Sequence, residues 1–225
     1  MLVLRNAHVD AFQDSPDAWP PSMDLEGFRY ERLGSVGSSE RDDMRRRPSE
    51  AWADWIERDP VFSSQPYTQL AATLLAAGRR NTAEAIQYVG RERERTQAWA
   101  HGDISSWAWL TGLSLAAGYG IGGYTFRVLW WVLVFTVVGF VFLCSSPTAR
   151  AHSVLWRLGA SLHRLLPIVR LSKEFDDFFD NPSTNPNWPR NLNRIQVGYF
   201  AVHAIIGWVL GLILLAAMSG LTQKG

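Results

Sequence analysis

The sequence predicts a mainly α-helical protein: a two-span α-helical integral membrane protein with a small soluble N-terminal region of short strands and an α-hairpin. Residues 128–144 and 197–221 carry no charged side chain, and as helices they would be about 25 and 37 Å long, enough to cross a bilayer. Charge is also divided unevenly, because residues 1–103 hold 13 Lys and Arg and 17 Asp and Glu, against 9 and 4 in residues 104–225. Two buried helices of a soluble protein are the alternative, but few polar residues remain to cover them.

The N-terminal region is expected to contain short strands followed by helices. Residues 1–33 alternate apolar and polar side chains between Pro, Asp and Ser clusters, which is typical of strands; they would form the last rung of a larger sheet or pair with another chain. Residues 34–50 are a linker, rich in Gly and Ser and then in charge. Residues 51–103 form a soluble helical region, in which the helices on either side of Gly78 make an α-hairpin similar to one tetratricopeptide-type unit. The alternating charges of residues 91–95 are expected to be a solvated face, or else a contact for phospholipid headgroups.

The segments that flank the first span have the composition of a membrane interface. Residues 104–127 are rich in Gly and Trp, and we expect an interfacial or partly re-entrant lead-in there. Residues 145–196 form the loop between the spans; within it, apolar residues at helical spacing over 151–166 predict an amphipathic helix on the bilayer or against the spans. The acidic stretch 174–180 is expected to be a solvated loop. Basic side chains in these segments are candidates for contact with lipid or ions: Arg127, Arg157, Arg164 and Arg170.

The spans themselves contain small residues and one histidine that are candidates for helix packing and interaction. His203, Gly207 and Gly211 lie four residues apart and so share one helix face. The Gly207-xxx-Gly211 spacing lets two helix backbones approach closely, with Gly139 on the first span as the expected partner, within the chain or between copies. His203 is either a neutral imidazole bonded to a Ser, Thr or Tyr of a neighbouring helix, or a proton relay or ligand contact.

Several function classes are excluded by composition and spacing. A net charge of +1 gives no basic surface for nucleic acid, and the single cysteine, Cys144, excludes an internal disulfide and a multi-cysteine metal site. Residues 118–123 match G-x-G-x-x-G and contain the GYG of a potassium filter, but neither the strand–helix context of the first nor the outer span of the second is present. We therefore expect no catalytic, cofactor-binding or metal-binding residues.

The location of the chain follows from its charges and its N-terminus. The seven Lys and Arg between the spans would place that loop inside the cell, whereas the polar first 20 residues differ from a signal peptide and favour cytoplasmic termini. An even number of spans puts both termini on one side. We expect a multi-pass protein of the bacterial inner (cytoplasmic) membrane with cytoplasmic termini.

Four segments carry a resemblance to a known family. The order of residues 62–88, 116–131, 161–171 and 199–223 resembles the C-terminal region of bacterial membrane proteins labelled membrane-associated oxidoreductases or pentapeptide-repeat-like proteins. The resemblance implies that a β-solenoid-like domain precedes this region, of which residues 1–33 are similar to the final rung. Where that family has GYGYRPWRA, this chain has GYGIGGYTFRV and lacks the Pro-Trp pair.

These observations favour a membrane-anchored interaction or accessory subunit of a bacterial membrane assembly. Its spans would pack with other membrane subunits or with copies of itself in the lipid bilayer, and its α-hairpin would dock a soluble partner. One alternative is a subunit of a small oligomeric ion channel or transporter, motivated by the Gly-rich lead-in and the histidine in a span. A second alternative, a membrane-associated oxidoreductase, is implied by the family label alone.

Overall fold

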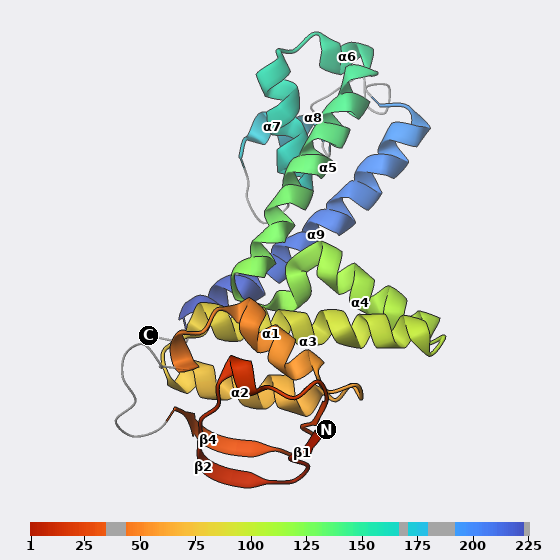
Figure 1. Ribbon diagram of the computed structural model, residues 1–225. Helices are drawn as coiled ribbons and strands as arrows, with labels where there is room; N and C mark the ends of the chain where they lie inside the picture. The colour runs from red at the N-terminus through yellow and green to blue at the C-terminus, as the bar shows by residue number, and fades with distance from the viewer. Residues whose placement is uncertain (35–43, 167–170, 180–191, 223–225) are drawn as a thin grey trace. The chain divides into compact units, whose positions relative to one another are not determined.

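The computed structural model describes residues 1–34, 44–166, 171–179 and 192–222 (Figure 1). These residues are mainly helical, with a few short strands. They divide into two compact units, Met1–Ser114 and Leu115–Gly225, which are described separately below.

The first unit begins with two stacked turns of chain, each contributing two short strands. The strands are β1 (Leu2–Val3), β2 (His8–Phe12), β3 (Met23–Asp24) and β4 (Arg29–Leu33). β1 pairs in parallel with β3, and β2 pairs in parallel with β4, at the same sequence offset in both pairs. Each turn has a left-handed corner, at Asn6 in the first and at Gly27 in the second. A Cβ on Gly27 would lie 2.1 Å from the Asn6 side-chain oxygen, so the stacking requires glycine there.

Helices complete the core of the first unit. They are α1 (Ser49–Glu57), α2 (Ser64–Ala76) and α3 (Arg80–Ala100). α2 and α3 pack against each other as the sequence predicted for an α-hairpin, and α2 also packs against β4. The buried side chains are large and aromatic or branched: Phe28, Tyr30, Leu33, Trp52, Trp55, Ile56, Tyr67, Leu70, Leu74 and Ile86. Burial of such side chains is the main source of stability for a unit in water.

Side-chain amides connect the strands to the helices. Gln65 of α2 donates to the Phe28 carbonyl at 3.0 Å and accepts from the Gly27 N–H at 3.0 Å, and Gln69 donates to the Tyr30 carbonyl at 2.7 Å. These bonds satisfy backbone groups along the edge of the second turn of chain. The second turn is therefore fixed to α2 by polar contacts as well as by packing.

The α4 helix (Ile104–Ala117) occupies the first part of the predicted lead-in. Its N-terminus is capped by Asp103, which accepts from the Ser106 N–H at 3.1 Å and the Ser105 hydroxyl at 2.8 Å. Hydrogen bonds from Ser106 and Ser105 lower the pKa of Asp103 to about 2. Short 3-10 turns, Gly118–Gly120 and Gly122–Phe126, follow the helix.

In the part of the second unit that the structure describes, five α-helices of unequal length follow α4. They are α5 (Arg127–Cys144), α6 (Pro147–Arg150), α7 (Val154–Leu165), α8 (Lys173–Phe179) and α9 (Arg194–Thr222). α5, α7 and α9 pack against one another, and α8 packs against α7 (Figure 1). The amphipathic α7 therefore lies against the two long helices, which is one of the two positions that the sequence left open for it.

Two helices of the described part are long and apolar enough to cross a membrane. They cover Gly122–Cys144 and Arg194–Leu215, and only 17% and 28% of the residues in their most apolar stretches are buried. Both figures are low for helices in the core of a soluble protein, where most side chains are covered. Large apolar side chains are accordingly exposed along both helices: Leu129, Trp130, Leu133, Val134, Val137 and Val141 on α5, and Val202, Ile205, Trp208, Val209, Leu212 and Leu215 on α9.

Candidate functional site: a small, polar helix junction

Two of the three glycines predicted for helix packing, Gly139 on α5 and Gly207 on α9, face α7 of the same chain. A Cβ on Gly139 of α5 would lie 2.2 Å from the Ser161 hydroxyl oxygen and 3.1 Å from His203 Cε1. A Cβ on Gly207 of α9 would lie 1.4 Å from the carbonyl oxygen of Leu165, a backbone atom that has little freedom to move. The glycines therefore let α7 enter between the long helices.

His203 joins α9 to α7 through a hydrogen bond and makes a second hydrogen bond within α9. Its side chain is fully buried, with Nδ1 at 2.9 Å from the Tyr199 hydroxyl and Nε2 at 3.2 Å from the carbonyl oxygen of Ser161. A carbonyl can only accept, so Nε2 carries the proton and donates to it, and the Tyr199 hydroxyl donates to Nδ1. Both ring nitrogens are thus satisfied in the neutral form. The geometry favours the packing role for His203 over the proton relay.

Hydroxyl groups satisfy the rest of the junction. The Ser161 hydroxyl donates to the Thr136 carbonyl at 2.8 Å, and the Thr136 hydroxyl donates to the Val132 carbonyl at 2.7 Å. Ser161 and Thr136 are both buried. We name the set Thr136, Gly139, Ser161, Tyr199, His203 and Gly207 the helix junction.

Sequence reasoning identified three members of the helix junction and missed the others. Gly139, His203 and Gly207 were predicted, and Gly211, one turn beyond Gly207, is buried on the same helix. Thr136, Ser161 and Tyr199 were not singled out. Tyr199 stands four residues before His203, a spacing that places both on one helix face, and this signal could have found it.

α7 runs antiparallel to α5 and ends about halfway along α9. Gln196, at the start of α9, donates to the Phe142 carbonyl at 3.0 Å and the Ser145 hydroxyl at 2.8 Å, so the start of α9 is level with the end of α5. From that level, Gly207 lies about 16 Å along α9 at 1.5 Å per residue. Because the C-terminal residue of α7, Leu165, contacts Gly207, α7 ends about 16 Å from the level at which α9 begins.

The four predicted arginines fall in different surroundings. The Arg157 Nη1 lies 3.0 Å from Cys144 Sγ, and its guanidinium lies 5.3 Å from the centre of the Phe140 ring. Arg164 lies over Phe179 at 5.5 Å, and Arg127 lies over Tyr124 at 5.8 Å. Arg170 is outside the described residues. Arg157 and Arg164 thus contact the unit's own rings, whereas Arg127 also lines a groove considered below.

The described part of the acidic stretch is the helix α8 and not a loop, although its Glu174 remains exposed as expected for a solvated segment. α8 carries Asp176, which accepts from His163 Nε2 of α7 at 2.8 Å, while His163 Nδ1 accepts from the Leu171 N–H at 3.2 Å. Glu174 accepts from the Trp156 indole N–H at 2.6 Å. The aromatic residues of the same stretch explain why it folds as a helix. Phe178 and Phe179 are buried, and their burial places the neighbouring acidic side chains against α7.

The charge run of residues 91–95 is divided between two roles. Arg91 pairs with Glu94 at 2.7 Å and Arg95 pairs with Glu92 at 2.5 Å, along the helix surface. Arg93 instead donates to the Tyr67 hydroxyl at 3.0 Å and to the carbonyl of Asp59. The prediction of a solvated face is therefore wrong for Arg93, which joins α3 to the end of α1 and to α2. Burial raises the pKa of Tyr67, and the bond from Arg93 opposes that rise.

Among the residues that the structure describes, no group of three or more His, Cys, Asp or Glu side chains is placed to hold a metal ion. Comparison with protein-family models, with curated proteins and with solved structures gave no match. The function is therefore inferred from the geometry of each unit.

Proposed function

We propose that this chain is a membrane-anchored interaction or accessory subunit. In this proposal α5 and α9 cross a bilayer and α7 enters it between them. The first unit remains in water, where the α2–α3 hairpin docks a soluble partner. The observation that carries the proposal is the distribution of side chains in the second unit: large apolar groups are exposed along α5 and α9, whereas small and polar groups are buried where these helices meet α7.

That distribution suits hydrocarbon better than water. In water, exposed Leu, Val and Trp side chains leave apolar surface in contact with solvent, which is unfavourable in free energy. In lipid the same side chains carry no such penalty. Lipid also gives no hydrophobic drive for helices to associate, so close packing of small residues and interhelical hydrogen bonds hold membrane helices together. The glycines and the His203 bonds of the helix junction provide both.

The end of α3 and the start of α4 fit the membrane surface. Trp99 and Trp109 are 61% and 68% exposed, and Ile104 between them is 65% exposed. The Trp99 and Trp107 rings lie 5.0 Å apart, so several amphipathic rings gather at this turn. Indole rings concentrate at the headgroup level of bilayers. This supports the interfacial role that the sequence predicted for residues 104–127.

The docking role of the hairpin is supported by its rigidity and its outward side. The inward side of α2 is fixed by Tyr67, Leu70 and Leu74 in the core. The opposite side presents Thr68, Ala72 and Leu75, which are exposed. A rigid helix face that carries small and apolar side chains can bind a partner at a low cost in conformational entropy. The family resemblance implies a bacterial membrane for this subunit.

Two experiments test the proposal. First, membranes from cells that produce the chain are washed with alkaline carbonate; the proposal expects the chain in the pellet, and its release into the wash would contradict the spans. Second, a photo-crosslinking amino acid is placed at Ala72, at Leu75, or at Asp10, an exposed strand position that serves as the control. We expect one discrete adduct from Ala72 and Leu75 and none from Asp10. Adducts that do not depend on the site, or none at all, would contradict the docking role.

A measurement on vesicles separates the proposal from the channel alternative. Purified chain in liposomes is assayed for proton and potassium flux. In the described residues the hydrogen bonds from Tyr199 through His203 end at the carbonyl of Ser161, which cannot pass a proton onward. We therefore expect flux equal to that of empty liposomes. A flux that His203→Phe removes would favour the channel.

A further inference from the structure

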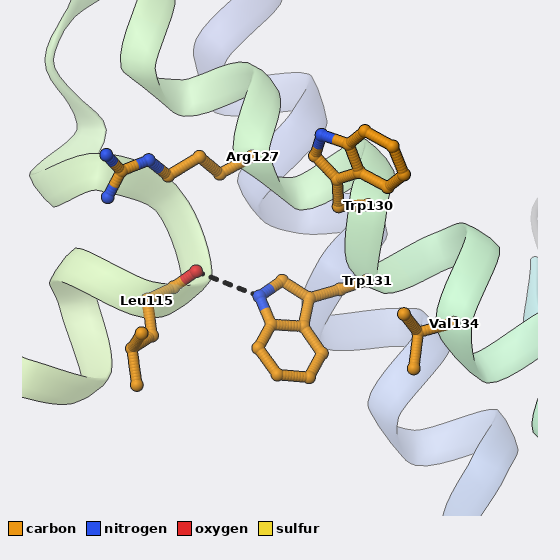
Figure 2. A pocket seen from close by; sticks show the side chains of 5 residues that line it. All are labelled: Leu115, Arg127, Trp130, Trp131 and Val134. Atoms are coloured by element: carbon orange, nitrogen blue, oxygen red, sulfur yellow. Dashed lines mark hydrogen bonds between the residues drawn. The ribbon is translucent and has the colours of Figure 1, made fainter.

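One face of α5 forms a groove with a charge at one end. Arg127, Trp130, Trp131 and Val134 follow the i, i+3, i+4, i+7 spacing that places side chains on a single helix face. Together with Leu115 they line a space of about 430 Å³ (Figure 2). This lies within the range of volumes that hold small organic ligands.

The floor of the groove is fixed by a hydrogen bond. The Trp131 indole N–H donates to the carbonyl of Leu115 at 2.8 Å, which holds the ring between α4 and α5 (Figure 2). Trp130 projects beside it and is 69% exposed, and Val134 is 44% exposed. The groove is thus preformed, apolar and open to the surroundings, with one of its two indole rings held in place. Preformed sites bind with less loss of side-chain entropy than mobile ones.

The polarity of the groove changes along the helix axis. Arg127 is the first residue of α5, and in Figure 2 its guanidinium extends away from the two indole rings. At 1.5 Å per residue, the Trp pair lies about 5 Å and Val134 about 10 Å further along the axis. Among the five lining residues, Arg127 carries the single formal charge, and that charge is positive.

We propose that this groove binds an anionic phospholipid of the bilayer. The phosphate lies on the guanidinium of Arg127, and one acyl chain follows Trp130, Trp131 and Val134 into the hydrocarbon. Charge complementarity selects this occupant, because a guanidinium presents paired N–H donors to phosphate oxygens while the rest of the groove offers only apolar contact and ring faces. The order of charge, indole and aliphatic side chain also follows the order of phosphate, glycerol region and acyl chain across a leaflet. This inference rests on the proposed membrane location of α5.

The test measures lipid retained by the purified chain. The chain is reconstituted into vesicles of equal phosphatidylglycerol and phosphatidylcholine, extracted in mild detergent, and analysed by native mass spectrometry for bound lipid of each class. Arg127→Gln removes the charge. Arg194→Gln is the matched control, because Arg194 is an exposed arginine at the first residue of the other long helix and does not line the groove. Arg127→Lys retains a charge but not the planar fork of donors.

We expect the native chain and Arg194→Gln to retain phosphatidylglycerol over phosphatidylcholine. In Arg127→Gln the ratio of retained phosphatidylglycerol to phosphatidylcholine is expected to fall about fivefold, and in Arg127→Lys it is expected to fall less. Filling the groove with Val134→Trp is expected to lower retention of both lipids while α5 stays inserted. Equal preference in Arg127→Gln and Arg194→Gln would overturn the inference. Failure of the chain to enter vesicles at all would instead overturn the proposed membrane location.

Discussion

The two units of this protein differ in which side chains they bury, and the second unit departs from the usual pattern of a fold in water. The first unit buries Trp52, Trp55 and Phe28 and shows mainly polar side chains around them. The second unit buries Gly139, Ser161 and His203 at its helix junction and exposes Leu, Val and Trp along α5 and α9. The first pattern is that of a fold stabilised by removing apolar surface from water. The second is that of helices whose surroundings are themselves apolar.

The difference shows that each unit should be sensitive to a different kind of change. In the first unit, apolar burial dominates and polar contacts add local precision. In the second unit, the helices associate through close backbone approach and a few hydrogen bonds, so one added methyl group can cost more than one removed ring. The predictions below begin with the largest expected effect.

Gly207→Ala is expected to destabilise the second unit most. The new Cβ would lie 1.4 Å from the Leu165 carbonyl oxygen, so α7 and α9 must separate. We expect a loss of about 3 kcal/mol in the free energy of unfolding, as for severe overpacking. The measurement is titration of the detergent-solubilised chain with sodium dodecyl sulfate, followed by circular dichroism. Gly198→Ala is the control, because nothing lies within 4 Å of its Cβ. Equal midpoints for the two variants would contradict the contact between α7 and α9.

Arg93→Met is expected to loosen the first unit and leave the helix junction unchanged. The substitution removes the bonds to Tyr67 and to the Asp59 carbonyl. A bond from a charged donor contributes about 2 kcal/mol, which corresponds to about 30-fold faster hydrogen exchange of the α1 and α2 amides. Arg91→Met removes an exposed helix-surface pair and should change exchange by a factor of about two. If both variants exchange alike, Arg93 has no special role.

Gly139→Ala should be rescued by a second substitution in α7. The added Cβ would lie 2.2 Å from the Ser161 hydroxyl oxygen, and Ser161→Gly removes that oxygen. We expect Gly139→Ala to cost about 2 kcal/mol and the double variant to recover about half, beyond the cost of Ser161→Gly alone. The same detergent titration gives the coupling energy. Strictly additive effects would show that α5 and α7 do not meet at these residues.

The smallest expected effect is a pH dependence of the α4 cap. Hydrogen bonds from Ser106 and Ser105 lower the pKa of Asp103 from 3.8 to about 2. A carboxylate with a lowered pKa stabilises the fold fully above its ordinary pKa and loses that contribution as the pH falls through the lowered value. The amide nitrogen resonance of Ser106 should therefore titrate with a midpoint near pH 2. It should not titrate in Asp103→Asn, which keeps an acceptor without the charge, and a midpoint near 3.8 in the native chain would contradict the cap.

The two long helices and α7 could be predicted from the sequence because a local pattern specifies each of them. The charge-free runs predicted both long helices, and the apolar spacing over residues 151–166 predicted α7. The place of α7 could not be derived, because its apolar face fits a bilayer surface and a helix pair equally well. What decides its place is that Gly139 and Gly207 lie opposite Ser161 and Leu165, a relation between residues distant in sequence.

The remaining differences have the same origin. Residues 91–95 look solvated by composition, and Arg93 turns inward because Tyr67 and the end of α1 lie beneath it. The acids around Asp176 look like a solvated loop, and the phenylalanines among them fold the segment onto α7. In both cases tertiary contacts overrode a local preference. The partner, localisation and family expectations remain predictions.

The most direct test of the central claim is to measure whether lipid or water surrounds the outward side chains of each unit. Cys144 is replaced by serine, and a nitroxide is attached at Val137→Cys on α5, at Trp208→Cys on α9, or at Leu75→Cys on α2, in chain reconstituted into vesicles. Paramagnetic resonance then compares collisions of each label with oxygen, which enters lipid, and with a charged nickel chelate, which does not. We expect high oxygen and low nickel accessibility at residues 137 and 208, and the reverse at residue 75. High nickel accessibility at all three positions would contradict the account.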